Sequence, residues 1–187
     1  MHKFFVVVVL VCSLLFSFHV SAKSYRSELR QATKQGRIYD AKTWDANLLW
    51  HATLFTDDYR QTFDRKHIEL QRLDSVEAAR WIAGEQTQQS KGWEVFMGLY
   101  SKSDYKAFSS GAETFWHAEL IGADGKKVQP VSVEAVPTTP YQFVMFPHLS
   151  RWAKTYRVVF PKIDLGTSPA LSLWSVIGES KVTWKIK

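Results

Sequence analysis

Cysteine is nearly absent from the chain. The only one, Cys12, lies in the apolar segment at the start of the sequence. The remaining residues therefore offer no disulfide, no thiol nucleophile and no cysteine-ligated metal site. We expect the fold to be held by packing alone, without covalent cross-links.

Familiar catalytic motifs are lacking as well. The sequence has no GxGxxG, no GxxxxGK[ST], no HExxH and no GxSxG nucleophile elbow. Asp124-Gly125 lacks the spaced acidic residues of a calcium-binding loop, so it predicts a tight turn. These absences favour a non-catalytic protein, and we expect no cofactor.

Proline and glycine are scarce in the first half of the chain. Between the apolar segment and Gly92 there is no proline, and the only glycines are Gly36 and Gly84. In that half, apolar residues recur every three or four positions. After Gly92, glycine and proline separate short runs that alternate with a period of two. The change predicts helices first and strands afterwards.

The first 22 residues have the three parts of a secretory signal peptide. A short basic start precedes an apolar run, Phe4 to Phe18, and Val20-Ser21-Ala22 places small residues where signal peptidase cuts. We expect cleavage after Ala22. The alternative is a membrane anchor, but the run of 15 residues is shorter than the roughly 20 needed to cross a bilayer.

Export has consequences for location and partners. The cleaved chain would be periplasmic or secreted and would not span a membrane. The lack of disulfides fits a bacterial periplasm better than the animal extracellular space. The formal charge of +6 becomes +5 without the signal, which holds one lysine and no acid. The charge could attract an anionic lipid surface or a polyanionic glycan, but an ordinary solvated surface of mildly basic balance is the favoured explanation. Nucleic acid is not an expected partner.

Three helices are predicted before Gly92. A short one spans Tyr25 to Gln35, and a long one runs from Lys42 toward Leu73. A third starts at Asp74, where Glu77 completes a capping box. The long helix rests on an apolar stripe of Trp44, Leu48, Ala52, Phe55, Tyr59 and Phe63. The third helix would face inward with Val76, Ala79 and Ala83. Thr56-Asp57-Asp58 offers an alternative, a break and a fresh helix start.

Strands are predicted after Gly92. Pro130 argues that its strand lies at an edge or contains a bulge. The alternating runs are Trp93–Leu99, Trp116–Leu120, 127–136, Tyr141–Phe146, Thr155–Phe160, Leu171–Ile177 and 182–186. The predicted class is therefore α+β. Residues 1–22 form the signal, a helical segment at 23–91 packs on the sandwich, and 92–187 form an immunoglobulin-like antiparallel β-sandwich of about seven strands.

One pair of residues could bind a metal ion. His117 and Glu119 are two apart on a predicted strand, so the imidazole and the carboxylate point to the same face. A third ligand, His148, would be needed, and nothing in the sequence places it nearby. The simpler alternative is that the pair lies on the solvent face of its strand.

A second candidate site lies in the loop-like stretch from Pro147 to Lys154. It collects His148, Arg151 and Trp152, and an exposed tryptophan is a platform for a sugar ring. We therefore expect an exported, non-catalytic binding or accessory protein of the bacterial envelope, with a protein or an envelope component as partner. The alternatives are an envelope hydrolase or metal-dependent enzyme using His117, Glu119 and His148, and a glycan-binding module centred on Trp152.

Overall fold

The computed structural model describes residues 24–101, 108–109 and 114–186. The expected signal and its cleavage site lie outside these residues. Two antiparallel sheets and four helices make up the described chain, which confirms the α+β class. None of the described helices is long and apolar enough to cross a membrane.

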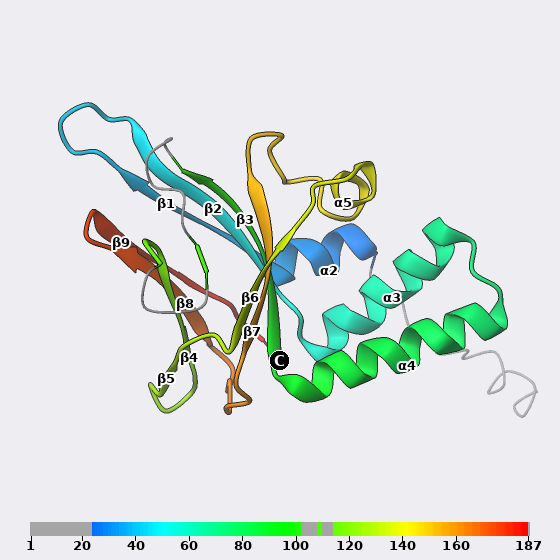
Figure 1. The fold of residues 1–187 in the computed structure, drawn as a ribbon. Helices are drawn as coiled ribbons and strands as arrows, with labels where there is room; N and C mark the ends of the chain where they lie inside the picture. Colours follow the sequence, from blue (N-terminus) through cyan, green and yellow to red (C-terminus); the bar gives the residue numbers. More distant parts are fainter. Residues whose placement is uncertain (1–23, 102–107, 110–113, 187) are drawn as a thin grey trace, which may run out of the picture.

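Figure 1 shows three layers: the helices, the larger sheet and the smaller sheet. The larger sheet has the order β1-β2-β3-β7-β6, and the smaller has the order β5-β4-β8-β9. The larger sheet consists of β1 (Thr33–Tyr39), β2 (Ala46–Leu54), β3 (Trp93–Ser101), β7 (Lys154–Phe160) and β6 (Ser132–Val136). The smaller consists of β5 (Lys127–Val128), β4 (His117–Ile121), β8 (Ala170–Ser175) and β9 (Gly178–Thr183).

The main core lies between the two sheets and defines which side of each strand is buried. In β2 the side chains that point into this core are Leu48, Trp50, Ala52 and Leu54, each 0% exposed. The prediction of a helix through this stretch was wrong. Steps of four residues fit a strand as well as a helix, because four is twice the strand period. Since β2 pairs with β3, residue 92 does not separate a helical unit from a β unit.

A second core lies on the other face of the larger sheet, under the helices. It joins α2 (Tyr25–Ala32), α3 (Asp57–Gln71) and α5 (Pro140–Met145) to the outward side chain of Phe96. The short first helix is confirmed in part: it ends at Ala32 and not at Gln35, because residues 33–35 belong to β1. Thr56 accepts a hydrogen bond from the backbone N–H of Tyr59 and caps α3, so the alternative of a fresh helix start there is the correct one.

Helix α4 (Ser75–Lys91) has the predicted capping box at Asp74 and Glu77. It runs antiparallel to α3, and this helical pair extends away from the sheets (Figure 1). The prediction that α4 buries its small apolar side chains was wrong, since Val76, Ala79 and Ala83 are all exposed. The helix instead faces inward with Trp81 and Glu85, so polar and aromatic contacts hold it in place.

The strands after Gly92 match the prediction in part. The predicted strand at 127–136 is divided into β5 and β6, which belong to different sheets, and the last strand begins at Gly178 and not at residue 182. Tyr141–Phe146 forms α5 and not a strand, because Pro140 occupies the first helical turn and Thr139 and Gln142 form a capping box. Pro130 lies between β5 and β6, which are edge strands of different sheets. The immunoglobulin-like topology stays a prediction.

Candidate functional site

Two adjoining hollows form a groove on the helical side of the larger sheet. The first, which we call the α2 hollow, has a volume of about 480 Å³ and lies between α2, β1 and the loop after α5. The second, the Trp152 hollow, has a volume of about 410 Å³ and lies between β2, β3 and the same loop. Both hollows are lined by Gln35 and His51, so they are continuous.

The sheet and the loop after α5 bring two histidines together in this groove. His51 lies between the inward side chains of Trp50 and Ala52, so it points to the outer face of β2. His148 follows α5 and lies beside it, with ring centroids 5.1 Å apart. The loop approaches closely because residue 98 is a glycine: a Cβ there would lie 2.6 Å from Leu149 Cδ2.

Both imidazoles are neutral at neutral pH. Burial lowers the pKa of His51, and burial together with the neighbouring His51 lowers the pKa of His148 to about 4. A neutral imidazole has one nitrogen that donates a hydrogen bond and one that accepts. The pair can therefore donate hydrogen bonds to the hydroxyl groups of a ligand and also accept hydrogen bonds from them.

Aromatic side chains form the other wall of the groove. Trp152 is 79% exposed and lines the Trp152 hollow together with Tyr100, which is 39% exposed. The backbone N–H of Trp152 donates to Ser150 Oγ at 3.2 Å, which helps to fix the loop that carries the indole. A contiguous apolar patch on the surface is typical of a site that binds a ligand or a partner.

The sequence-predicted binding residues are therefore only partly brought together. His148 and Trp152 line adjoining parts of the groove. Arg151 lies in the same loop and is exposed, but it is outside the lining of both hollows. His51 was not predicted as a site residue, because only the pairing of β2 with β3 and the position of the loop place it there.

The predicted metal ligands lie elsewhere. His117 stacks on Trp174 with ring centroids 4.3 Å apart, and Glu119 pairs with Lys127 at 3.2 Å. Both point outward from the smaller sheet, because Ala118 between them is in the core. His148 lies on the opposite side of that core. Among the described residues, no three histidines, cysteines or acids are grouped to hold a metal ion.

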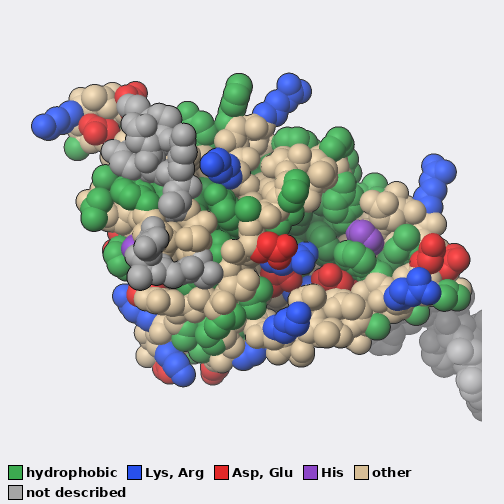
Figure 2. Space-filling model, viewed as in Figure 1, with side chains coloured by type: hydrophobic (Ala, Val, Ile, Leu, Met, Phe, Trp, Pro, Cys, Tyr) green, Lys and Arg blue, Asp and Glu red, His purple; other side chains and the backbone are tan. Residues whose placement is uncertain are grey.

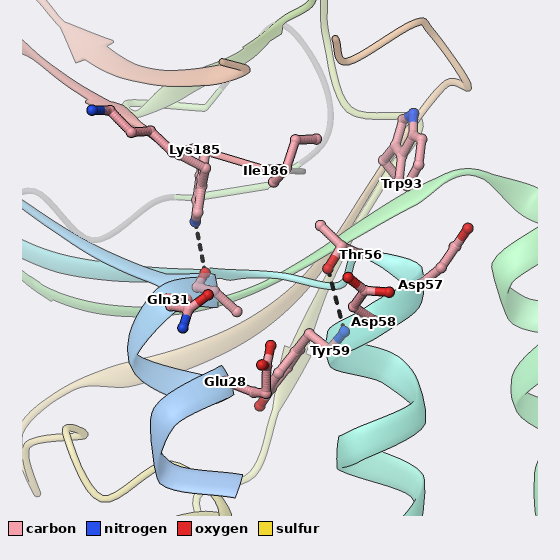
Figure 3. A pocket seen from close by; sticks show the side chains of 11 residues that line it. Glu28, Gln31, Thr56, Asp57, Asp58, Tyr59, Trp93, Lys185 and Ile186 are labelled. Carbon is pink, nitrogen blue, oxygen red and sulfur yellow. Dashed lines mark hydrogen bonds between the residues drawn. The ribbon is translucent and has the colours of Figure 1, made fainter. Parts of the chain in front are cut away.

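A third hollow, of about 270 Å³, is acidic (Figure 3). Glu28 from α2 and Asp57 and Asp58 from the first turn of α3 line it, while the amine of Lys185 points away. Acidic residues are favoured in the first turn of a helix, where they complement the helix dipole. Asp57 also accepts a hydrogen bond from Gln89 at 2.5 Å, so it links α3 to α4. The positions of the three carboxylates in first helical turns are therefore explained by the helices that carry them.

A buried ion cluster holds the helical pair to the sheet. Arg60 of α3 donates to Glu85 of α4 at 2.5 Å and to Glu94 of β3 at 2.9 Å, and all three residues are buried. Arg157 of β7 pairs with Glu94 at 3.0 Å. Burial and the nearby Glu94 carboxylate raise the pKa of Glu85, with Arg60 acting in the opposite direction. The sequence offered no sign of this cluster, since its members are far apart in the chain.

A wide hollow of about 560 Å³ opens beside this cluster. Figure 2 shows acidic, basic and histidine side chains close together at the base of the helical pair. His67 stacks on Trp81 with centroids 3.5 Å apart, and its Nδ1 is 2.5 Å from the Tyr141 hydroxyl. Trp81 donates to Asp64 at 3.0 Å. These groups are occupied with one another, which suits a structural joint between α3, α4 and α5.

Comparison of the chain with protein-family models, with curated proteins and with solved structures finds no match. Function is therefore inferred from the geometry and chemistry of the groove.

Proposed function

We propose that this is an exported, non-catalytic binding protein of the bacterial cell envelope, and that it binds an envelope glycan in the groove at His51 and His148. The observation that carries the proposal is the position of Trp152. Its indole is 79% exposed beside a hollow that also contains His51 and Gln35, and His148 lies next to His51 in the adjoining hollow. Aromatic faces stack on the apolar faces of sugar rings, and the polar groups bind sugar hydroxyls.

The location outside the cytoplasm rests on the signal-like first 22 residues. A binding role is favoured over catalysis by the arrangement of the groove. Its lining residues include no aspartate or glutamate, whereas hydrolysis of a glycan needs a pair of carboxylates.

The chain provides a closely matched control for the test. Trp44 is also 79% exposed, but it lies in the turn between β1 and β2 and lines none of the hollows described above. Removing either indole deletes the same amount of exposed aromatic surface. Only Trp152→Ala removes it from the groove.

The experiment is co-sedimentation of the purified protein with peptidoglycan sacculi. We expect the wild type and Trp44→Ala to pellet equally, and Trp152→Ala to lose at least tenfold in affinity without a change in melting temperature. The proposal is wrong if the wild type stays in the supernatant, or if Trp152→Ala pellets as the wild type does.

A further inference from the structure

Positive charge is concentrated at one end of the groove. Arg26, Arg30 and Lys34 line the α2 hollow, and no aspartate or glutamate lines either this hollow or the adjoining one. Among the described residues, none of these three cations is paired with a carboxylate. This end of the groove therefore has a positive potential that the protein does not neutralise.

The spacing of the cations adds a small mutual repulsion to this end of the groove. Arg26 and Arg30 are four residues apart on α2, so they lie on the same face of the helix, where like charges repel and destabilise it. Lys34 follows on β1, is half-buried and contributes to the lining of the same hollow. An anion bound between them would replace the repulsion by attraction.

The two ends of the groove differ in chemistry, so a ligand that fills both needs an apolar face at one end and a negative charge at the other. The Trp152 hollow offers the indole and Tyr100 as flat apolar surfaces, and the α2 hollow offers cations and the hydroxyls of Ser27 and Thr33. The two neutral imidazoles lie where the hollows meet. A sugar chain that carries acidic groups satisfies both ends.

We infer that the groove binds an acidic saccharide, with a sugar ring on Trp152 and a carboxylate or phosphate between Arg26, Arg30 and Lys34. This inference rests on the proposed function and specifies the chemical class of the ligand. A membrane surface is a poorer partner for these groups. A bilayer is flat and meets groups that project, whereas Lys34 is half-buried and lines a concavity.

The test compares charge variants on acidic and neutral sugars. The variant Arg30→Gln/Lys34→Gln removes two charges from the groove. The control Lys126→Gln/Lys181→Gln removes two charges from exposed positions on the smaller-sheet side. Affinity is measured by affinity electrophoresis on polygalacturonate, a dextran phosphate and unmodified dextran, at two salt concentrations, with phosphatidylglycerol vesicles as a further arm.

We expect the groove variant to lose at least tenfold in affinity for one or both acidic polysaccharides, and to show a weaker salt dependence. Its affinity for neutral dextran should equal that of the wild type, and the control should match the wild type throughout. A preference for polygalacturonate identifies a carboxylate, and a preference for dextran phosphate identifies a phosphate.

Three results would overturn the inference. They are an unchanged affinity of the groove variant for both acidic polymers, an equal loss in the control, and tighter binding to the vesicles than to either polysaccharide. If dextran binding still depends on Trp152 in those cases, the proposed glycan-binding function stands without the acidic preference. If no polysaccharide binds in a Trp152-dependent way, both proposals fail.

Discussion

Gly36 and Trp50 face each other in the register of β1 and β2, and the Trp50 indole occupies the space above Gly36. From there Trp50 Nε1 donates to Ser180 Oγ on β9 at 3.1 Å. The backbone N–H of Arg37 donates to the same oxygen, also at 3.1 Å. The absence of a side chain at residue 36 thus allows a buried tryptophan of one sheet to reach the other.

The first prediction concerns this contact. A Cβ at residue 36 would overlap the indole and lie 2.6 Å from Ser180 Oγ, so Gly36→Ala should destabilise the fold by about 1–3 kcal/mol, as overpacking does. The measurement is urea unfolding followed by tryptophan fluorescence. Gly84→Ala is the control. A Cβ at residue 84 would have no neighbour within 4 Å, and replacing glycine by alanine in a helix should raise the unfolding free energy by about 0.5–1 kcal/mol. Equal effects of the two changes would contradict the prediction.

Phe55 anchors the core beneath the helices. It is 4% exposed, and its ring meets those of Tyr59 and Phe63 edge-on at 5.1 and 5.0 Å. Phe55→Ala should therefore cost about 3–5 kcal/mol of unfolding free energy, as for other large core truncations. Val176→Ala, at a position 92% exposed, should change stability by less than about 0.5 kcal/mol. A cost below about 1 kcal/mol at residue 55 would be incompatible with this packing.

Arg60 is the centre of the buried ion cluster. Arg60→Met would leave the carboxylates of Glu85 and Glu94 buried without their main partner, and we expect a loss of about 3–5 kcal/mol. The double variant Arg60→Met/Glu85→Gln should recover part of the lost unfolding free energy, because the second substitution removes one of the two unpaired buried carboxylates. Lys66→Ala breaks a surface pair with Glu69 and should cost less than about 1 kcal/mol. The idea fails if Arg60→Met is as mild as Lys66→Ala.

The paired imidazoles make stability depend on pH. The folded-state pKa of His148 is about 4, below the ordinary value of 6.5, so between these values the unfolded chain holds a proton that the folded chain lacks. The stabilisation is complete above pH 6.5 and is lost as the pH falls toward 4, with a slope of up to about 1.4 kcal/mol per pH unit. Burial lowers the pKa of His51 too, which adds in the same direction.

The matching experiment is thermal and urea unfolding between pH 5 and 6.5 for the wild type and His148→Gln. The unfolding free energy of the wild type minus that of the variant should decrease as the pH falls, because only the wild type carries the titrating imidazole. Carboxyl groups such as Glu85 titrate in both proteins, so their contribution cancels. Parallel curves for the two proteins would show that His148 is protonated equally in the folded and unfolded states.

The period of two predicted most strands well, and the failures have physical causes. Leu48 and Ala52 are four apart, which fits both a helix turn and two strand repeats, and only Trp50 and Leu54 between and after them reveal a strand. Phe143 and Val144 favour a strand by composition, but Pro140 and the capping box decide the structure. Helix α4 is held by Glu85 and Trp81, contacts that a search for apolar stripes does not detect.

The candidate site was predictable in part. The loop with His148 and Trp152 stands out in the sequence because it collects polar and aromatic groups after a proline. The role of His51, and the position of Arg26, Arg30 and Lys34 around the same groove, depend on contacts between residues roughly a hundred positions apart. Such contacts follow from the sheet register and from the packing of α2, which no local pattern specifies.

The Trp184 indole donates to the carbonyl of Ala32 at 2.6 Å, where α2 passes directly into β1. These two residues are separated by 152 positions, so the end of the first described helix is bound by the indole of a residue that is synthesised much later. A nascent chain shorter than this cannot close its core, and contacts of such range form late in folding. The complete fold therefore becomes possible only when nearly the whole chain is available.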